Sequence, residues 1–340
     1  MKRMNKLIIG LVALLVLVGC SSKNNTDGGN LVIYSPSSEG IINAVIPLFE
    51  EETGIKVELI SASTGELLKR IESESDSPGG DVLFGVSYSQ LLSNTALFDE
   101  YVAKEDDKVI EAYRNKSGYT TYFILDGSVL VVNTDLTKDI PIKSYEDLLN
   151  PALKGKIATS DPATSGSAFS QLSNILLSMS DDGTYTSDKA WDYVADLIAQ
   201  WDGKVQGSSS AVYKSVVDGE MYVGLSYEDP VAKLIKDGAT NIEIVHPTEG
   251  AVYTPTGASL IKNAKNGENG QKFLDFIIGA EAQGIFGTAL TNRPVREGAE
   301  VGEYLVDFND IERKEEDMNY ILEHKTEIVD RYTKLFADSQ

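Results

Sequence analysis

Short apolar segments alternate with helical segments along this chain, and this alternation is the feature that most restricts its fold. Near the start of the body, apolar strands are expected at residues 31–34, 56–60 and 81–84. Between them, residues 41–52 and 66–74 have apolar side chains at helical spacing. Strands that alternate with helices pair in parallel through βαβ units. The sequence therefore predicts an α/β fold.

A second group of strands and helices follows in the middle of the chain. The strands are expected at residues 127–133, 156–160, 221–225 and 242–245, and the helices at 168–179, 191–201 and 211–218. Two more helices are expected near the end, at residues 271–279 and 317–336. A length of 340 residues suits two domains. We therefore expect the middle of the chain to form a separate α/β unit.

The composition excludes several classes of function. With 30 basic and 52 acidic residues the formal net charge is −22, which would repel nucleic acids and anionic lipid surfaces. Cys20 is the only cysteine, so the body has no disulfide scaffold, zinc–thiolate site or cysteine nucleophile. Only His246 and His324 are available for a histidine metal site or a Ser-His-Asp triad. The sequence also lacks Gly-x-Ser-x-Gly, P-loop and His-Glu-x-x-His motifs.

The first twenty residues have the features of an export signal. A basic start precedes a largely aliphatic run at residues 7–18, which is too short to span a bilayer. The run ends in Leu-Val-Gly-Cys at residues 17–20, which resembles the bacterial lipoprotein box, in which the cysteine is lipidated. The alternative is an ordinary secretory signal with an incidental cysteine. We expect a lipoprotein signal peptide over residues 1–20, an extracytoplasmic lipid anchor at Cys20, and a flexible tether over residues 21–30.

Four loops place serine, threonine or glycine at the start of a predicted helix. A helix N-terminus offers unpaired N–H groups and a partial positive charge, so each loop is a candidate site for an anion. The alternative for each loop is an ordinary N-cap, the usual role of serine and threonine at this position. The candidate ligand-binding residues in these loops are Ser37, Ser38, Thr64, Ser165, Gly166, Ser167, Ser208 and Ser209.

Carboxylates close to a strand end suggest a second part of the ligand. Tyr227, Glu228 and Asp229 follow the strand predicted at residues 221–225, and Glu249 lies in a Pro-x-Glu-Gly turn. Carboxylates accept hydrogen bonds from sugar hydroxyls or from an ammonium group, so all four residues are candidate ligand-binding residues. The alternative is surface charge or hinge hydrogen bonding, and for Glu249 a structural role in its turn is favoured.

Five segments, in their order and spacing, resemble the solute-binding proteins of bacterial ABC importers, in the branch of ferric-iron, phosphonate and hexose-phosphate binders. They are residues 49–57 (FEEETGIKV), 127–136 (GSVLVVNTDL), 161–168 (DPATSGSA), 217–220 (VDGE) and 247–250 (PTEG). The resemblance runs from residue 31 to about residue 296. It implies the type II periplasmic-binding-protein fold, in which two α/β lobes are joined by a hinge of two crossing strands and hold the ligand in a cleft.

The resemblance also implies where the lobes divide. Lobe one would comprise residues 31–127 and 256–340, and lobe two residues 128–255. The crossings would lie near Gly127 and near residues 252–257. In this arrangement the four serine-rich loops would converge on one cleft, because the C-terminal ends of the strands face it.

The function that follows from the resemblance is capture of a small anionic solute, either a sugar phosphate or a phosphonate. The chain would deliver this solute to an ABC permease in the membrane as a monomer, without a cofactor or metal and without enzymatic activity. The alternative solute is ferric iron or an iron complex. Ferric members carry adjacent tyrosines after a Gly-Leu strand, whereas Asp229 and Pro230 occupy those positions here. A surface lipoprotein enzyme is a further alternative, with Ser165 as its nucleophile but no evident base.

We predict that Cys20→Ala releases the protein from the membrane fraction while the body stays folded, because the cysteine is the expected point of lipid attachment. Cell fractionation measures the distribution, and circular dichroism of the released protein checks the fold. Retention of the variant in the membrane fraction would contradict lipid anchoring.

Overall fold

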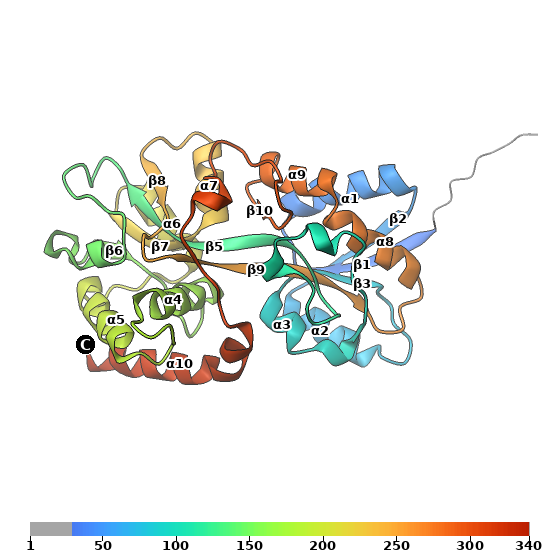
Figure 1. The fold of residues 1–340 in the computed structure, drawn as a ribbon, viewed down its shortest axis with the longest axis horizontal. Helices are drawn as coiled ribbons and strands as arrows, with labels where there is room; N and C mark the ends of the chain where they lie inside the picture. Colours follow the sequence, from blue (N-terminus) through green and yellow to red (C-terminus); the bar gives the residue numbers. More distant parts are fainter. Residues whose placement is uncertain (1–28, 340) are drawn as a thin grey trace, which may run out of the picture.

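Two lobes lie side by side in the computed structural model, which describes residues 29–339 (Figure 1). Two long strands join the lobes, and helices cover the strands of each lobe. The strand order β2-β1-β3-β9-β5-β7-β6 runs from one lobe into the other. This is the α/β arrangement that the alternating sequence pattern predicts.

Lobe one contains the first two βαβ units, which share β2, and the helices that follow the hinge. Strands β2, β1 and β3 pair in parallel, in that order. Its core is rich in phenylalanine, and the rings of Phe84 and Phe123 stack with centroids 4.7 Å apart. The elements of this lobe are β1 (Asn30–Ser35), α1 (Glu39–Thr53), β2 (Lys56–Ser61), α2 (Thr64–Ser73), β3 (Val82–Ser87), α3 (Tyr88–Leu92), β4 (Phe98–Asp99), α8 (Gly267–Ile277), α9 (Ala280–Thr288) and β10 (Arg293–Pro294).

Lobe two is built from the middle of the chain. Strands β6 and β7 pair in parallel, and the helices α4 and α5 pack against each other beside them. Trp191 and Trp201 of α5 are both buried in this core. The elements of this lobe are β6 (Ile157–Ala158), α4 (Gly166–Met179), α5 (Asp188–Trp201), α6 (Ser209–Val217), β7 (Val223–Tyr227), α7 (Glu228–Lys236) and β8 (Ile242–Val245).

The hinge consists of β5 (Thr121–Asn133) and β9 (Ala251–Ile261), which are antiparallel (Figure 1). The first half of β5 pairs with β9, and its second half pairs with β7 and β8 in lobe two. The other end of β9 pairs with β3 in lobe one. Where β5 changes partner, a Cβ atom on Gly127 would come within 2.3 Å of the Tyr253 ring. Glycine at this position therefore leaves room for the tyrosine ring on the partner strand.

The C-terminal helix α10 (Met318–Asp338) packs against lobe two, although the sequence assigns all of residues 256–340 to lobe one. Its buried stripe of Ile321, Ile328 and Tyr332 belongs to the core of lobe two. The chain reaches this position because the segment after β10 crosses the hinge, where β11 (Arg313–Lys314) pairs with β9 (Figure 1). An apolar stripe predicts that a helix is buried, but it does not say against which lobe.

No helix within residues 29–339 is long and apolar enough to cross a membrane, and this includes α10. The signal peptide and most of the tether expected from the sequence lie outside the described residues.

Candidate ligand cleft

A cavity of about 620 Å³ lies between the two lobes at the hinge. Lobe one contributes residues from segment 87–94 around α3, and lobe two contributes residues from segment 166–170 at the start of α4. The hinge strands contribute Asp126 and residues 254–256, and residues between 316 and 325 complete the lining. Because both lobes and the hinge line this cavity, any movement of the lobes would change its shape. It is therefore the candidate ligand site.

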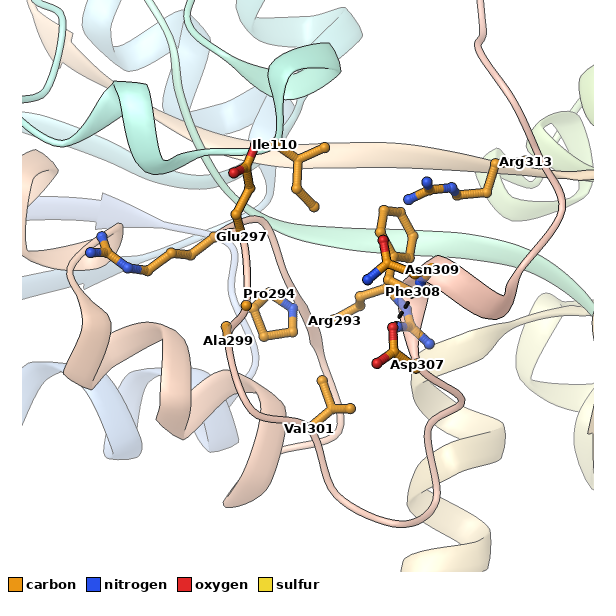
Figure 2. Close-up of a pocket in the computed structure, with 12 residues that line it drawn as sticks. Ile110, Arg293, Pro294, Glu297, Ala299, Val301, Asp307, Phe308, Asn309 and Arg313 are labelled. Atoms are coloured by element: carbon orange, nitrogen blue, oxygen red, sulfur yellow. Dashed lines mark hydrogen bonds between the residues drawn. The ribbon is translucent and has the colours of Figure 1, made fainter.

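A second cavity, of about 410 Å³, is a weaker candidate (Figure 2). Ile110 and residues from segment 293–313 line it, so lobe two contributes nothing to its lining. Its arginines already have partners: Arg296 donates to Glu105 at 2.6 Å, and the Arg313 guanidinium lies 3.9 Å from the centre of a phenylalanine ring. Movement of the lobes would not enclose a ligand here.

The N-terminus of α4 reaches the interlobe cavity and contains two serines with different roles. The hydroxyl of Ser165 caps the helix by accepting a hydrogen bond from the N–H of Ala168 at 3.3 Å. Ser167 does not cap the helix, and its hydroxyl lies 3.2 Å from that of Ser165. Gly166 and Ser167 both line the cavity. The first backbone N–H groups of the helix, its partial positive charge and the Ser167 hydroxyl are thus available at one place.

The remaining serine-rich loops lie outside the lining of this cavity. Ser38 precedes α1 without making a side-chain cap, so its hydroxyl has no capping role. At α2 the cap is Ser63, which forms a capping box with Glu66, and Thr64 is the first helical residue. Ser208 caps α6 with its hydroxyl. The convergence of all four loops on one ligand remains a prediction.

Two of the predicted residues have close partners within their own lobes. Ser37 lies against Gly85 of β3, where a Cβ atom would come within 1.8 Å of the serine Oγ. Gly85 also has a φ of +88°, so glycine is favoured there on both grounds. In lobe two, Ser209 is a hydrogen-bond partner of Tyr227, whose ring packs edge-on against that of Tyr213.

Glu228 lies at the centre of a buried polar cluster and is 1% exposed. Arg293 of β10 donates to both carboxylate oxygens, at 2.7 and 2.8 Å. His246 and the Tyr253 hydroxyl lie 3.0 and 3.1 Å from Oε1. Burial alone would raise the pKa of Glu228, but the hydrogen bonds from Arg293 and His246 outweigh it and lower the pKa to about 2. The structure thus gives Glu228 the hinge-bonding role that the sequence left as the alternative to ligand binding.

Asp229 and Glu249 also have partners within the protein. Thr291 donates its hydroxyl to Asp229 at 2.7 Å, which links α7 to the chain after α9 in lobe one. Burial raises the pKa of Asp229. Glu249 accepts the backbone N–H groups of Tyr145 and Glu146, at 3.1 and 3.0 Å. This is the structural role favoured for Glu249. Glu249 is not among the residues that line the interlobe cavity, so its predicted contact with a ligand is not supported there.

Asp126 of β5 lines the cavity and was not among the residues predicted from the sequence. Its Oδ1 atom is buried and has no hydrogen-bond partner. Burial raises the pKa of Asp126 well above its usual range, and the nearby charges of Asp229 and Glu228 raise it further. A charged residue in the middle of an apolar strand is a signal that the sequence does contain.

Glu316 connects the two lobes beside the cavity and was also missed. It lies between β11 and α10 and accepts hydrogen bonds from Tyr88 of lobe one and Ser173 of lobe two. Burial is the main cause that raises the pKa of Glu316. Nothing in its local sequence, Glu-Glu-Asp, distinguishes it from surface charge.

Within residues 29–339, no group of three or more His, Cys, Asp or Glu side chains is arranged to hold a metal ion. Asp229 and Pro230 both lie in the first turn of α7, where the ferric members would have their tyrosine pair.

Comparison with known families and proteins places the chain in a defined group. The family described as bacterial extracellular solute-binding protein matches residues 44–306. Iron uptake protein A1 of Synechocystis is 26% identical over 294 residues, which is 82% of this chain and 79% of that protein. A putative 2-aminoethylphosphonate-binding periplasmic protein of Salmonella typhimurium is 24% identical over 254 residues, which is 73% of this chain and 72% of that protein.

Solved structures with the same fold include binding proteins of different ligands. The periplasmic binding protein AfuA from Actinobacillus pleuropneumoniae, solved with fructose 6-phosphate, has a TM-score of 0.73 at 22% identity and covers 91% of this chain and 99% of its own. The ferric binding protein from Campylobacter jejuni has a TM-score of 0.73 at 22% identity and covers 90% and 99%. These likenesses confirm the type II periplasmic-binding-protein fold expected from the sequence.

We predict that Glu228→Ala lowers the free energy of unfolding by about 3–5 kcal/mol, because it leaves the Arg293 charge buried and unpaired. Glu243→Ala is the matched control on the exposed side of β8 and should change stability by no more than about 0.5 kcal/mol. Chemical denaturation measures both variants. Equal stability of the two would contradict a structural role for Glu228.

The same ion pair predicts a pH dependence. The pKa of Glu228 falls from an ordinary value of 4.5 to about 2 on folding, so its contribution is complete above about pH 4.5 and is lost as the pH falls towards 2. The stability difference between wild type and Glu228→Ala should therefore shrink across this window.

Proposed function

The chain belongs to the bacterial extracellular solute-binding proteins, and we propose that it captures a small solute with a phosphoryl or phosphonyl group in the cavity between its lobes. The protein is the extracytoplasmic binding component of an ABC importer. The observation that carries the proposal is the N-terminus of α4, which brings Gly166 and Ser167 into the cavity lining.

The chemistry of the cavity favours an anion held by dipoles and neutral donors. A phosphoryl group has several acceptor oxygens, and a helix N-terminus supplies backbone N–H groups together with partial positive charge. Of the described residues that line the cavity, Lys325 is the only basic one, and its Nζ lies 4.6 Å from the centre of the Phe169 ring. We propose that Ser167 donates its hydroxyl to the anion while Ser165 keeps the helix capped.

Ferric iron or an iron complex is the second candidate solute. The observation in its favour is that relatives named for iron uptake and for Fe(3+) binding match most of the chain. Against it stands the chemistry of this chain, since iron prefers hard anionic oxygen donors such as phenolates, and proline at position 230 supplies none. The phosphorylated solute therefore remains the first candidate.

We further propose how the protein works at the membrane. Lipid at Cys20 would keep the body near the membrane, and a monomer would deliver its solute to the cognate permease. A ligand that contacts both lobes would favour the closed arrangement by its differential affinity for it. Two relatives are named for binding, of Fe(3+) and of 2-aminoethylphosphonate, and we expect this protein likewise to return its solute unchanged.

The experiment that tests this proposal is a direct search for the solute. Mass spectrometry of small molecules released by denaturing the purified protein should identify a compound with a phosphoryl or phosphonyl group. Thermal unfolding should then show a concentration-dependent stabilisation by that compound and little change with ferric citrate. A visible phenolate-to-iron absorption band at stoichiometric iron would instead support the ferric alternative.

Ser167→Ala is predicted to weaken binding of the released solute by about tenfold or more. A hydrogen bond to a charged group contributes about 1.5–3 kcal/mol, and each 1.4 kcal/mol is a factor of ten. Stability without ligand should change little, because the cap of α4 is Ser165.

The matched control is Ser165→Ala, which removes the cap two residues away. It should lower the free energy of unfolding by about 1 kcal/mol. Calorimetric titration and chemical denaturation of both variants separate the two roles. Unchanged affinity of Ser167→Ala would remove this serine from the site.

A further inference from the structure

The interlobe cavity contains a carboxyl group with one oxygen for which the protein provides no partner. Asp126 lies on β5 in the half that pairs with β9, and it is partly exposed to the cavity that Ser167 also lines. Its Oδ1 is buried without a hydrogen-bond partner. A buried carboxylate oxygen without a partner costs free energy, so its persistence requires an explanation.

The surroundings of Asp126 add negative charge instead of balancing it. The negative charges of Asp229 and Glu228 help to raise the pKa of Asp126, and the hydrogen bond from the backbone N–H of Asp229 lowers it. The nearby cation, Arg293, donates to both oxygens of Glu228 and forms no ion pair with Asp126. Two neighbouring carboxyl groups thus differ: both oxygens of Glu228 are paired, whereas Oδ1 of Asp126 has no partner within the protein.

Two parts of the cavity lining therefore differ in polarity. The start of α4 offers N–H groups, a hydroxyl and partial positive charge, whereas the hinge offers a carboxyl oxygen without a partner. A ligand that satisfies both parts has an anionic group and a cationic group in one small molecule. A hydroxyl group would supply a hydrogen bond to Asp126, but only an ammonium group would also favour the ionised form of this carboxyl group, which burial and the nearby charges of Asp229 and Glu228 disfavour.

We propose that Asp126 is a specificity-determining residue that receives an ammonium group, so that the solute carries an amino group as well as its phosphoryl or phosphonyl group. This inference rests on the proposed function, because it places the anionic end of the solute at α4. Rotation of the carboxylate about its Cβ–Cγ bond exchanges the two oxygens, so either of them can face the ammonium.

Matched pairs of compounds test the inference. 2-Aminoethylphosphonate is compared with ethylphosphonate, and glucosamine 6-phosphate with glucose 6-phosphate, by calorimetric titration. In at least one pair, wild type should bind the amino compound about tenfold or more tightly, as expected for a charge-assisted hydrogen bond. Asp126→Asn should reduce this preference to about twofold or less.

Two controls exclude a purely structural effect. Asp218→Asn removes one negative charge at an exposed position at the end of α6 and should keep the preference for the amino compound. Ligand-free Asp126→Asn should unfold at the same temperature as wild type or higher, because the substitution removes repulsion from Glu228 and Asp229. A residue with only a structural role would instead lower the unfolding temperature and leave the preference intact.

The outcomes separate this inference from the proposed function. If wild type binds both members equally in each pair, or if Asp126→Asn keeps the preference, the role of Asp126 is overturned. In that case the proposed function stands as long as Ser167→Ala weakens both members of the pair alike. Failure of all four compounds to bind wild type would overturn both proposals.

Discussion

The antiparallel pairing of β5 with β9 is the contact on which the two-lobed arrangement depends. These two strands carry the chain between the lobes and join the strands of the two lobes. β5 pairs with β7 in lobe two, and β9 pairs with β3 in lobe one. Gly127 permits the crossing because a larger residue would collide with Tyr253. The cavity lies at this crossing, so a ligand there contacts the part of the molecule about which the lobes would move.

Hydrogen bonds across the crossing fall into two groups. At the start of α7, Glu228 bonds to Arg293 and Asp229 bonds to Thr291. Both contacts connect lobe two to the last part of lobe one. Beside the cavity, Glu316 accepts hydrogen bonds from Tyr88 of lobe one and from Ser173 of lobe two. The first group is buried and charged, so breaking it is costly. Glu316 lines the cavity, so a ligand there would lie beside its contacts with both lobes.

The electrostatics of the cavity depend on which carboxylates the protein neutralises. Glu228 has an arginine, a histidine and a tyrosine as partners, and its pKa is lowered to about 2. Asp126 has none of these, and burial raises its pKa. A carboxyl group thus serves as a structural anchor at Glu228 and has an unsatisfied oxygen at Asp126. The N-terminus of α4 supplies the opposite polarity, which is notable in a chain with a net charge of −22.

The sequence by itself determined the class of fold, since the alternation of apolar and amphipathic segments predicts strands that alternate with helices and which face of each is buried. It also located Gly166 and Ser167, because a serine-rich segment before an apolar helix is a local signal. It did not locate α7, although acidic residues and a proline in a first turn are typical of a helix start. Only the tertiary structure decided that α10 covers lobe two, that Glu228 is paired and that Asp126 is not. Those outcomes depend on contacts between residues far apart in the chain, and no local pattern encodes which partner a buried charge will meet.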